Sequence, residues 1–116
     1  MNQEQIMLLN RMKKLIYHKK RRFEPRLDRD YLEDLLEFGL TEDAAWDQHI
    51  IYLNSNLYFF DKKLDYNKKD NLSLTFKKPI DGKVAYIKLR VEPNEFDEET
   101  VCLSFHVDGK PKKGGR

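Results

Sequence analysis

Apolar residues recur every three or four positions through the first half of the chain, a spacing typical of amphipathic helices. This pattern predicts three helices, over residues 3–20, 28–38 and 42–53. Pro25 separates the first two, because proline breaks a helix interior. Gly39 is expected to end the second helix and Thr41 to cap the third, as these residue types do at helix ends. The first half of the chain is therefore expected to be helical.

From residue 57 onward the apolar period changes to two, as in strands with one buried face. Strands are expected over residues 57–60, 71–78, 83–91 and 100–107. Pro79-Ile80-Asp81-Gly82 suits a turn in which glycine supplies a positive φ. Helices followed by strands predict an α+β fold, with N-terminal helices packed on a small antiparallel sheet. One domain would cover residues 1–107, followed by a disordered basic tail over 108–116.

The chain of 116 residues has the size of one domain. Its single cysteine, Cys102, excludes a disulfide framework and a Cys-rich zinc site, and fits a reducing compartment. His18, His49 and His106 are scattered without metal-ligand spacing, so no metal or other cofactor is expected. The longest apolar stretches fall far short of the ~20 residues of a membrane span, and the N-terminus lacks a signal-peptide pattern. These features predict a cytoplasmic protein with no membrane partner.

The formal net charge is only +2, but the charges are segregated along the chain. Residues 11–29 hold nine basic and two acidic side chains, whereas residues 30–50 hold seven acidic side chains and no Lys or Arg. Residues 92–99 add five acidic side chains. This arrangement predicts a dipolar surface with basic areas suited to phosphate-rich ligands. Two alternatives stay open: the charged segments are simply solvated, or opposite charges pair between two copies in a homodimer.

The two C-terminal strands constrain which polar side chains share a face. If they pair antiparallel with odd-numbered residues in the core, the numbers of facing residues add up to an even sum. A short connection then places Tyr86 near His106 and Lys88 near Ser104. The resulting open face carries a phenol, an imidazole, cations and no carboxylate, in the residues Tyr86, Lys88, Arg90, Cys102, Ser104 and His106.

This set of groups suits cleavage of RNA by its own 2′-hydroxyl. A base removes the hydroxyl proton, cations stabilise the charge on the phosphorane, and an acid protonates the leaving 5′-oxygen. His106 is the candidate general acid or base, and Tyr86 is the candidate orienting group or second proton donor. The simpler alternative is that both are ordinary strand residues, a tyrosine in cross-strand packing and a structural histidine.

Short segments also follow one another in a particular order from the second helix to the last strand. They are Leu36-Glu37-Phe38-Gly39-Leu40-Thr41, Ile50-Ile51-Tyr52-Leu53, Leu57-Tyr58-Phe59, Phe76-Lys77-Lys78-Pro79-Ile80-Asp81-Gly82, Val84-Ala85-Tyr86-Ile87-Lys88-Leu89 and Val101-Cys102-Leu103-Ser104-Phe105-His106. In this order they resemble the MqsR-type toxins of bacterial toxin–antitoxin systems, which belong to the RelE-like mRNA interferases. The resemblance implies a RelE-like α+β domain that cleaves messenger RNA without a metal and is neutralised by an antitoxin.

The resemblance also implies site residues. Tyr86 matches an active-site tyrosine of the family, and His106 takes the place of a basic residue on the last strand. The family's Tyr-Lys pair falls on Phe59-Phe60, with Tyr58 and Lys62 as the nearest substitutes. A glutamine of the family has no clear counterpart here.

We therefore expect an RNA-binding toxin that cleaves messenger RNA, free or on the ribosome, and that has a cognate antitoxin. Its predicted RNA-binding residues are Tyr58, Lys62, Lys77, Lys78, Lys88, Arg90, Lys19, Lys20, Arg21 and Arg22. The alternative is a non-catalytic module. In that case the basic helix over residues 11–22 binds nucleic acid or an acidic partner, and the acidic segment 30–50 binds a basic one.

Overall fold

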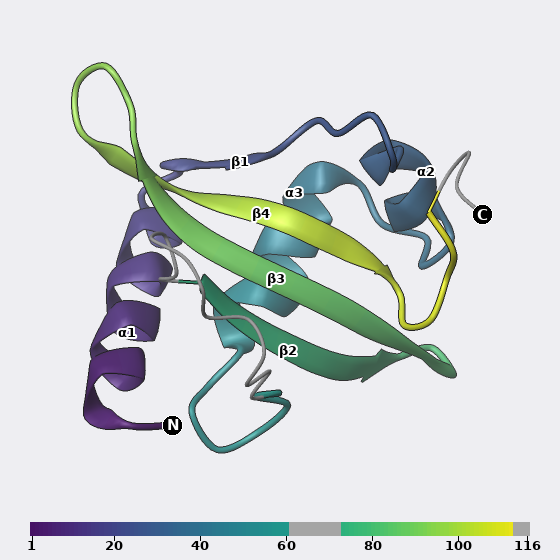
Figure 1. Ribbon diagram of the computed structural model, residues 1–116, viewed down its shortest axis with the longest axis horizontal. Helices are drawn as coiled ribbons and strands as arrows, with labels where there is room; N and C mark the ends of the chain where they lie inside the picture. Colours follow the sequence, from purple (N-terminus) through teal and green to yellow (C-terminus); the bar gives the residue numbers. More distant parts are fainter. Residues whose placement is uncertain (61–72, 113–116) are drawn as a thin grey trace.

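The computed structural model describes residues 1–60 and 73–112 and shows helices together with a four-stranded sheet (Figure 1), so the predicted α+β class is confirmed. The sheet order is β1-β4-β3-β2. In chain order, the elements are α1 (Gln3–Tyr17), β1 (Arg21–Phe23), α2 (Tyr31–Leu36), α3 (Glu42–Ala44), the π-helical turn η1 (Ala45–His49), the 3-10 turn η2 (Ile50–Tyr52), β2 (Ser73–Ile80), β3 (Lys83–Pro93) and β4 (Glu98–Val107). The helix predicted over residues 42–53 thus corresponds to α3, η1 and η2 in succession.

The core lies between one face of the sheet and the helices. In Figure 1, α3 lies behind the strands and α1 runs beside them at the left. The alternation predicted for β3 is confirmed, because Ala85, Ile87 and Leu89 are fully buried. They belong to one hydrophobic cluster that joins the sheet to the helical half. Its largest buried side chains include Met12, Ile16, Trp46 and Ile50 from the helical half and Phe76 and Phe105 from β2 and β4. The other face of the sheet carries the polar side chains of the strands.

α1 ends at Tyr17, before the predicted end at residue 20. Lys19 has a positive φ of 65°, and the N–H groups of Lys19 and Lys20 donate to the carbonyls of Ile16 and Leu15. These two bonds form a Schellman motif, which ends a helix at a left-handed residue that is usually glycine. Because lysine occupies this position, the sequence carries no glycine signal for the end of the helix.

The residues after this turn form β1, which makes the sheet mixed. Arg21, Arg22 and Phe23 pair in parallel with Thr100–Cys102 of β4. The prediction of a purely antiparallel sheet is therefore wrong, and so is the C-terminal end of the basic helix predicted over residues 11–22. Parallel pairing is possible here because the chain passes through all the other elements between β1 and β4.

β2 and β3 form a hairpin that closes at Asp81 and Gly82. Their φ angles of 50° and 79° define a two-residue turn with two positive φ values, for which Asp-Gly is a preferred sequence. Pro79 and Ile80, which were expected in the turn, are the last residues of β2. The turn is therefore tighter than predicted, and it sets the pairing of the two strands.

β3 and β4 pair in the predicted register over half of their length. Tyr86 faces His106, and Lys88 faces Ser104, which confirms the expected pairing. A bulge after Lys88 then shifts the register, so that the numbers of facing residues add up to odd sums. Cys102, predicted on the polar face, is consequently in the core at 1% exposure. One extra residue in β4 reverses the alternation on which that prediction depended.

Two further segments differ from expectation. The first predicted strand contributes only an isolated bridge between Phe59 and Phe76 of β2. Residues 108–112, predicted as part of a disordered tail, lie against α2, where the Lys110 ammonium binds the buried Asp34 carboxylate at 2.6 Å. The end of β4 is therefore tied to the helical half of the chain.

Candidate functional site

The polar face of the sheet, on the side opposite the core, carries the two predicted catalytic residues. By strand register its members are Thr75, Lys77, Tyr86, Lys88, Ser104 and His106. Tyr86 lies between Lys77 of β2 and His106 of β4. The rings of Tyr86 and His106 stack, with their centroids 5.0 Å apart and an interplanar angle of 27°. The structure thus brings the phenol and the imidazole into contact.

His106 is buried, at 7% exposure. Burial, together with the positive charges of Arg29 and Arg26, lowers the pKa of its imidazole from 6.5 to about 4, against the opposing effect of Asp34. At neutral pH the ring is therefore uncharged, the form that accepts a proton. Its Nδ1 atom is buried without a hydrogen-bond partner in the described part of the chain. The Nδ1 atom of His49 is buried without a partner in the same way, so it is the contact with Tyr86 that distinguishes His106.

A second row of side chains crosses the sheet next to this pair. Lys88 lies between Thr75 of β2 and Ser104 of β4, both of which are buried. Arg26 reaches the row from the edge of the sheet, where its Nη1 donates to Ser104 Oγ at 2.9 Å and to the Leu103 carbonyl at 3.2 Å. The Lys88 ammonium and the Arg26 guanidinium therefore lie on either side of the Ser104 hydroxyl. This row is two residues along the strands from the Tyr86–His106 stack.

Arg26 and Arg29 are the site residues that sequence reasoning missed. The Arg26 guanidinium binds both carboxylate oxygens of Asp28, at 2.9 and 2.7 Å, which orients it toward β4. Arg29 donates to the Lys110 carbonyl at 2.9 Å. Their sequence signal is weak, because both are simply part of the basic segment 11–29. Only the path of the chain from β1 to α2 brings them beside the end of β4.

Lys77 and Lys78 are consecutive in β2 and therefore lie on opposite faces of the sheet. The Lys77 Nζ lies 4.1 Å from the centre of the Phe60 ring. The Lys78 Nζ lies 5.7 Å from the centre of the Tyr58 ring, and burial lowers the pKa of the Lys78 ammonium. Lys78 is therefore separated from the Tyr86–His106 stack by the sheet. Lys62 lies outside the described residues.

Carboxylates are present at the far end of the polar face, beyond the bulge. Glu92 of β3 faces Glu99 of β4, and Arg22 of β1 binds both, at 3.1 and 2.6 Å. Arg90 also pairs with Glu92. The expectation of a face without carboxylates is therefore wrong, because both strands are longer than predicted and the bulge turns Glu99 to this side. Arg22 and Arg90, two predicted RNA ligands, each have a carboxylate partner within the chain.

The neighbouring basic residues have acidic partners as well. The Arg21 side chain is 5% exposed and binds Asp47 at 2.7 Å and Asp43 at 3.0 Å. Lys20 binds Asp97 at 2.5 Å. Part of the segments of opposite charge, predicted to form separate patches, thus pairs within a single chain. β1 causes this pairing, because it brings the basic residues between the two acidic segments.

Comparisons of the chain with models of known families, with curated proteins and with solved structures found no match. Within residues 1–60 and 73–112, no group of three or more His, Cys, Asp or Glu side chains could hold a metal ion. In the same part of the chain, no helix combines the length and the apolar character needed to cross a bilayer. The functional assignment therefore depends on the geometry of the polar face and on the sequence resemblance.

Proposed function

We propose that the polar face of the sheet binds RNA and that Tyr86 and His106 cleave it by attack of the neighbouring 2′-hydroxyl on the phosphate. The observation that carries this proposal is the Tyr86–His106 stack, whose centroids are 5.0 Å apart, with Lys88 and Arg26 in the adjacent row. A proton acceptor, a proton donor and two cations therefore lie within a few residues of one another on one surface.

In the proposed reaction, neutral His106 accepts the proton of the 2′-hydroxyl as its oxygen bonds to phosphorus. The Tyr86 hydroxyl protonates the 5′-oxygen as the P–O5′ bond breaks, which leaves a 2′,3′-cyclic phosphate and a 5′-hydroxyl. The anionic phosphate favours the protonated imidazole, because a nearby negative charge raises the pKa of a histidine. Lys88 and Arg26 supply positive charge for the phosphorane. Lys77, which pairs with Asp108 at 3.3 Å, and Arg26, which pairs with Asp28 at 2.7 Å, would each exchange part of that pairing for the phosphate.

The resemblance to MqsR-type toxins extends the proposal to a RelE-like toxin that acts in the cytoplasm on messenger RNA, free or on the ribosome. A cognate antitoxin would then neutralise it. Expression of the active chain should arrest growth, and co-expression of the antitoxin should restore it. The alternative of a non-catalytic module built on residues 11–22 has less support, because Arg21 and Arg22 bind carboxylates within the chain.

The test is cleavage of a defined, end-labelled messenger RNA by the purified chain, with EDTA present, with and without ribosomes. Tyr86→Phe and His106→Gln should each lower the rate by about 100-fold or more, as general acid–base groups do. The matched controls Tyr52→Phe and His18→Gln alter exposed residues and should cleave like the wild type. If all five proteins cleave alike, the activity does not come from this face and the catalytic assignment is refuted.

RNA binding without cleavage is a separate outcome, and it would replace the catalytic part of the proposal. Binding to the polar face would weaken as salt rises, with a slope of about 0.7 per phosphate contact on a single strand. Lys88→Gln should lower that slope by about the amount of one contact. An unchanged slope would place the RNA elsewhere on the molecule.

A further inference from the structure

α2 exposes apolar side chains on its outer side. Leu32 and Leu36 are 57% and 71% exposed, and Leu27, in the segment before the helix, is fully exposed. Single exposed leucines are ordinary, whereas neighbouring ones form an apolar patch of the kind that contacts a partner. Leu32 and Leu36 are neighbours because residues four apart lie on the same side of a helix.

Acidic side chains run alongside these leucines. Glu33 and Glu37 are also exposed and four residues apart, and the Asp30 carboxylate caps α2 by accepting from the Glu33 N–H at 3.3 Å. Lys110 binds Glu37 at 2.7 Å, whereas Asp30 and Glu33 have no ion-pair partner among the described residues. We refer to the outer side of α2 as the leucine–acidic surface, which consists of Leu27, Asp30, Leu32, Glu33, Leu36 and Glu37.

A cavity of about 360 Å³ adjoins the leucine–acidic surface at the start of α2. It is lined by Pro25, Arg26, Leu27, Arg29, Asp30, Tyr31 and Leu32. Its volume is at the lower end of the range for ligand pockets, so it suits one large apolar side chain and not an extended chain. Because Leu27 and Leu32 line it, the cavity adjoins the exposed leucines, and its lining also includes the charged side chains of Arg26, Arg29 and Asp30.

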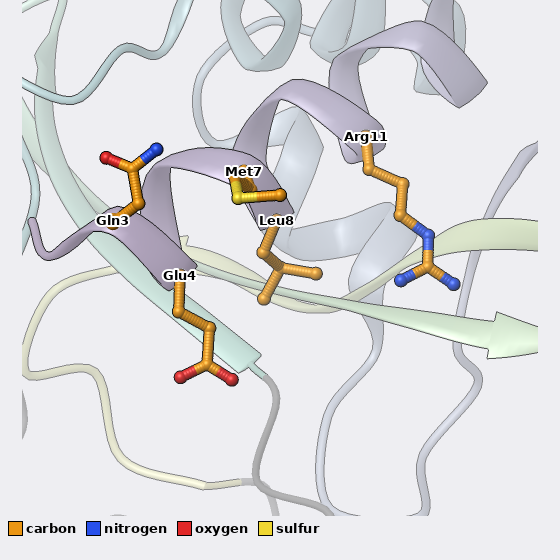
Figure 2. Close-up of a pocket in the computed structure, with 5 residues that line it drawn as sticks. All are labelled: Gln3, Glu4, Met7, Leu8 and Arg11. Carbon is orange, nitrogen blue, oxygen red and sulfur yellow. The ribbon is translucent and has the colours of Figure 1, made fainter.

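A larger hollow runs along α1, with a volume of about 500 Å³, but its chemistry is less selective. Figure 2 shows Glu4 and Arg11 at its two ends, with Leu8 between them. These two charges have opposite signs, so the hollow does not favour a partner of either sign. The leucine–acidic surface differs, because the charged side chains beside its exposed leucines are acidic; Arg26 and Arg29 lie in the adjoining cavity.

We propose that the leucine–acidic surface binds a protein partner through a basic amphipathic segment. Apolar side chains of that segment would cover Leu32 and Leu36, with one large side chain in the cavity, and its Lys or Arg residues would face Asp30 and Glu33. RNA and anionic membranes do not fit over Leu32 and Leu36, because their phosphates would be repelled by the Asp30 and Glu33 carboxylates. This inference goes beyond the proposed RNA cleavage and does not depend on it.

The test uses a synthetic peptide of leucine and lysine in helical amphipathic order, added to the isotope-labelled full chain and followed by NMR. A peptide of the same composition in scrambled order is the first control. A peptide with glutamate in place of lysine is the second. Binding to the leucine–acidic surface should shift the amide signals of residues 27–37 with the first peptide and not with the controls.

Matched variants then distinguish binding at the leucine–acidic surface from a general attraction between the basic peptide and acidic side chains. Leu36→Ser should weaken binding about tenfold, and Glu33→Gln about threefold, in line with a buried apolar contact and an exposed ion pair. Leu57→Ser and Glu95→Gln make the same changes at exposed positions elsewhere and should leave the affinity unchanged. All four variants alter exposed side chains, so their thermal midpoints should match that of the wild type.

Four results would overturn the proposal. The peptide could shift amides away from residues 27–37, or the Leu36→Ser and Leu57→Ser variants could bind it equally. The chain could also form a dimer that Leu36→Ser dissociates, in which case a second copy covers the surface. A single-stranded RNA that shifts the amides of Leu32 and Leu36, and not only those beside Arg26 and Arg29, would show that the surface belongs to the RNA site.

Discussion

The buried state of His106 predicts a loss of stability in mild acid. The pKa of its imidazole is about 4 in the fold, against an ordinary value of 6.5. Between these two pH values the unfolded chain binds a proton that the folded chain does not, so the free energy of unfolding rises with pH over this range. The stabilisation is fully present above pH 6.5 and is lost progressively as the pH falls toward 4.

The magnitude follows from the two pKa values. One pKa unit corresponds to about 1.4 kcal/mol, so the full difference is worth about 3 kcal/mol. Lowering the pH from 7 to 5 crosses most of the unfolded-state titration and should remove about 2 kcal/mol through His106 alone. This loss is large compared with the total stability of a small domain, which is typically about 5–15 kcal/mol.

Urea denaturation at pH 7 and pH 5 measures the effect, with three proteins compared. In His106→Gln, the loss between the two pH values should be about 2 kcal/mol smaller than in the wild type, whatever the effect of the substitution at pH 7. His18→Gln, at an exposed histidine, should lose as much as the wild type. The reasoning fails if His106→Gln loses as much stability as the wild type between pH 7 and pH 5.

Three further predictions concern backbone, charge and thiol. Lys19→Gly should raise the free energy of unfolding by about 0.5–1 kcal/mol and Gly82→Ala should lower it by about 1 kcal/mol, since both positions have positive φ. Urea titrations in which both variants change this free energy in the same direction would contradict the prediction. Arg21→Met should lower the free energy of unfolding by about 2 kcal/mol and Lys20→Met by less than about 0.5 kcal/mol, because only the Arg21 side chain is buried. Equal losses of stability in the two variants would refute this prediction. Burial raises the pKa of the Cys102 thiol, so a thiol reagent should label it only as the chain unfolds, and rapid labelling of the native chain would count against its burial.

The strand pattern and the most important pairing could be predicted from the sequence. Alternation placed Ala85, Ile87 and Leu89 in the core, and an even sum of residue numbers paired Tyr86 with His106. Both are consequences of the two-residue period of a strand, which is a local property. The prediction held only as far as the bulge after Lys88, because a bulge depends on how two strands fit together and leaves no periodic signal.

The segregation of charge could be read from the sequence, but the ion-pair partners of the charged residues could not. Arg22 binds Glu99, 77 residues further along, and Arg21 binds Asp47, 26 residues further along. Nothing local indicates such partners, because ion pairs between distant residues form only once the chain is folded. The segregated charges therefore predicted exposed basic patches, whereas several of them stabilise the fold.

The sequence by itself determined the α+β class, the helical and strand periods, the Asp81-Gly82 turn and the common face of Tyr86 and His106. The tertiary structure decided that β1 joins the sheet in parallel, that Arg26 reaches Ser104 and that His106 is buried and uncharged. The division has one physical reason. Periodicity and turns arise from neighbours along the chain, while burial, pKa and ion pairing depend on which distant segments the fold brings into contact.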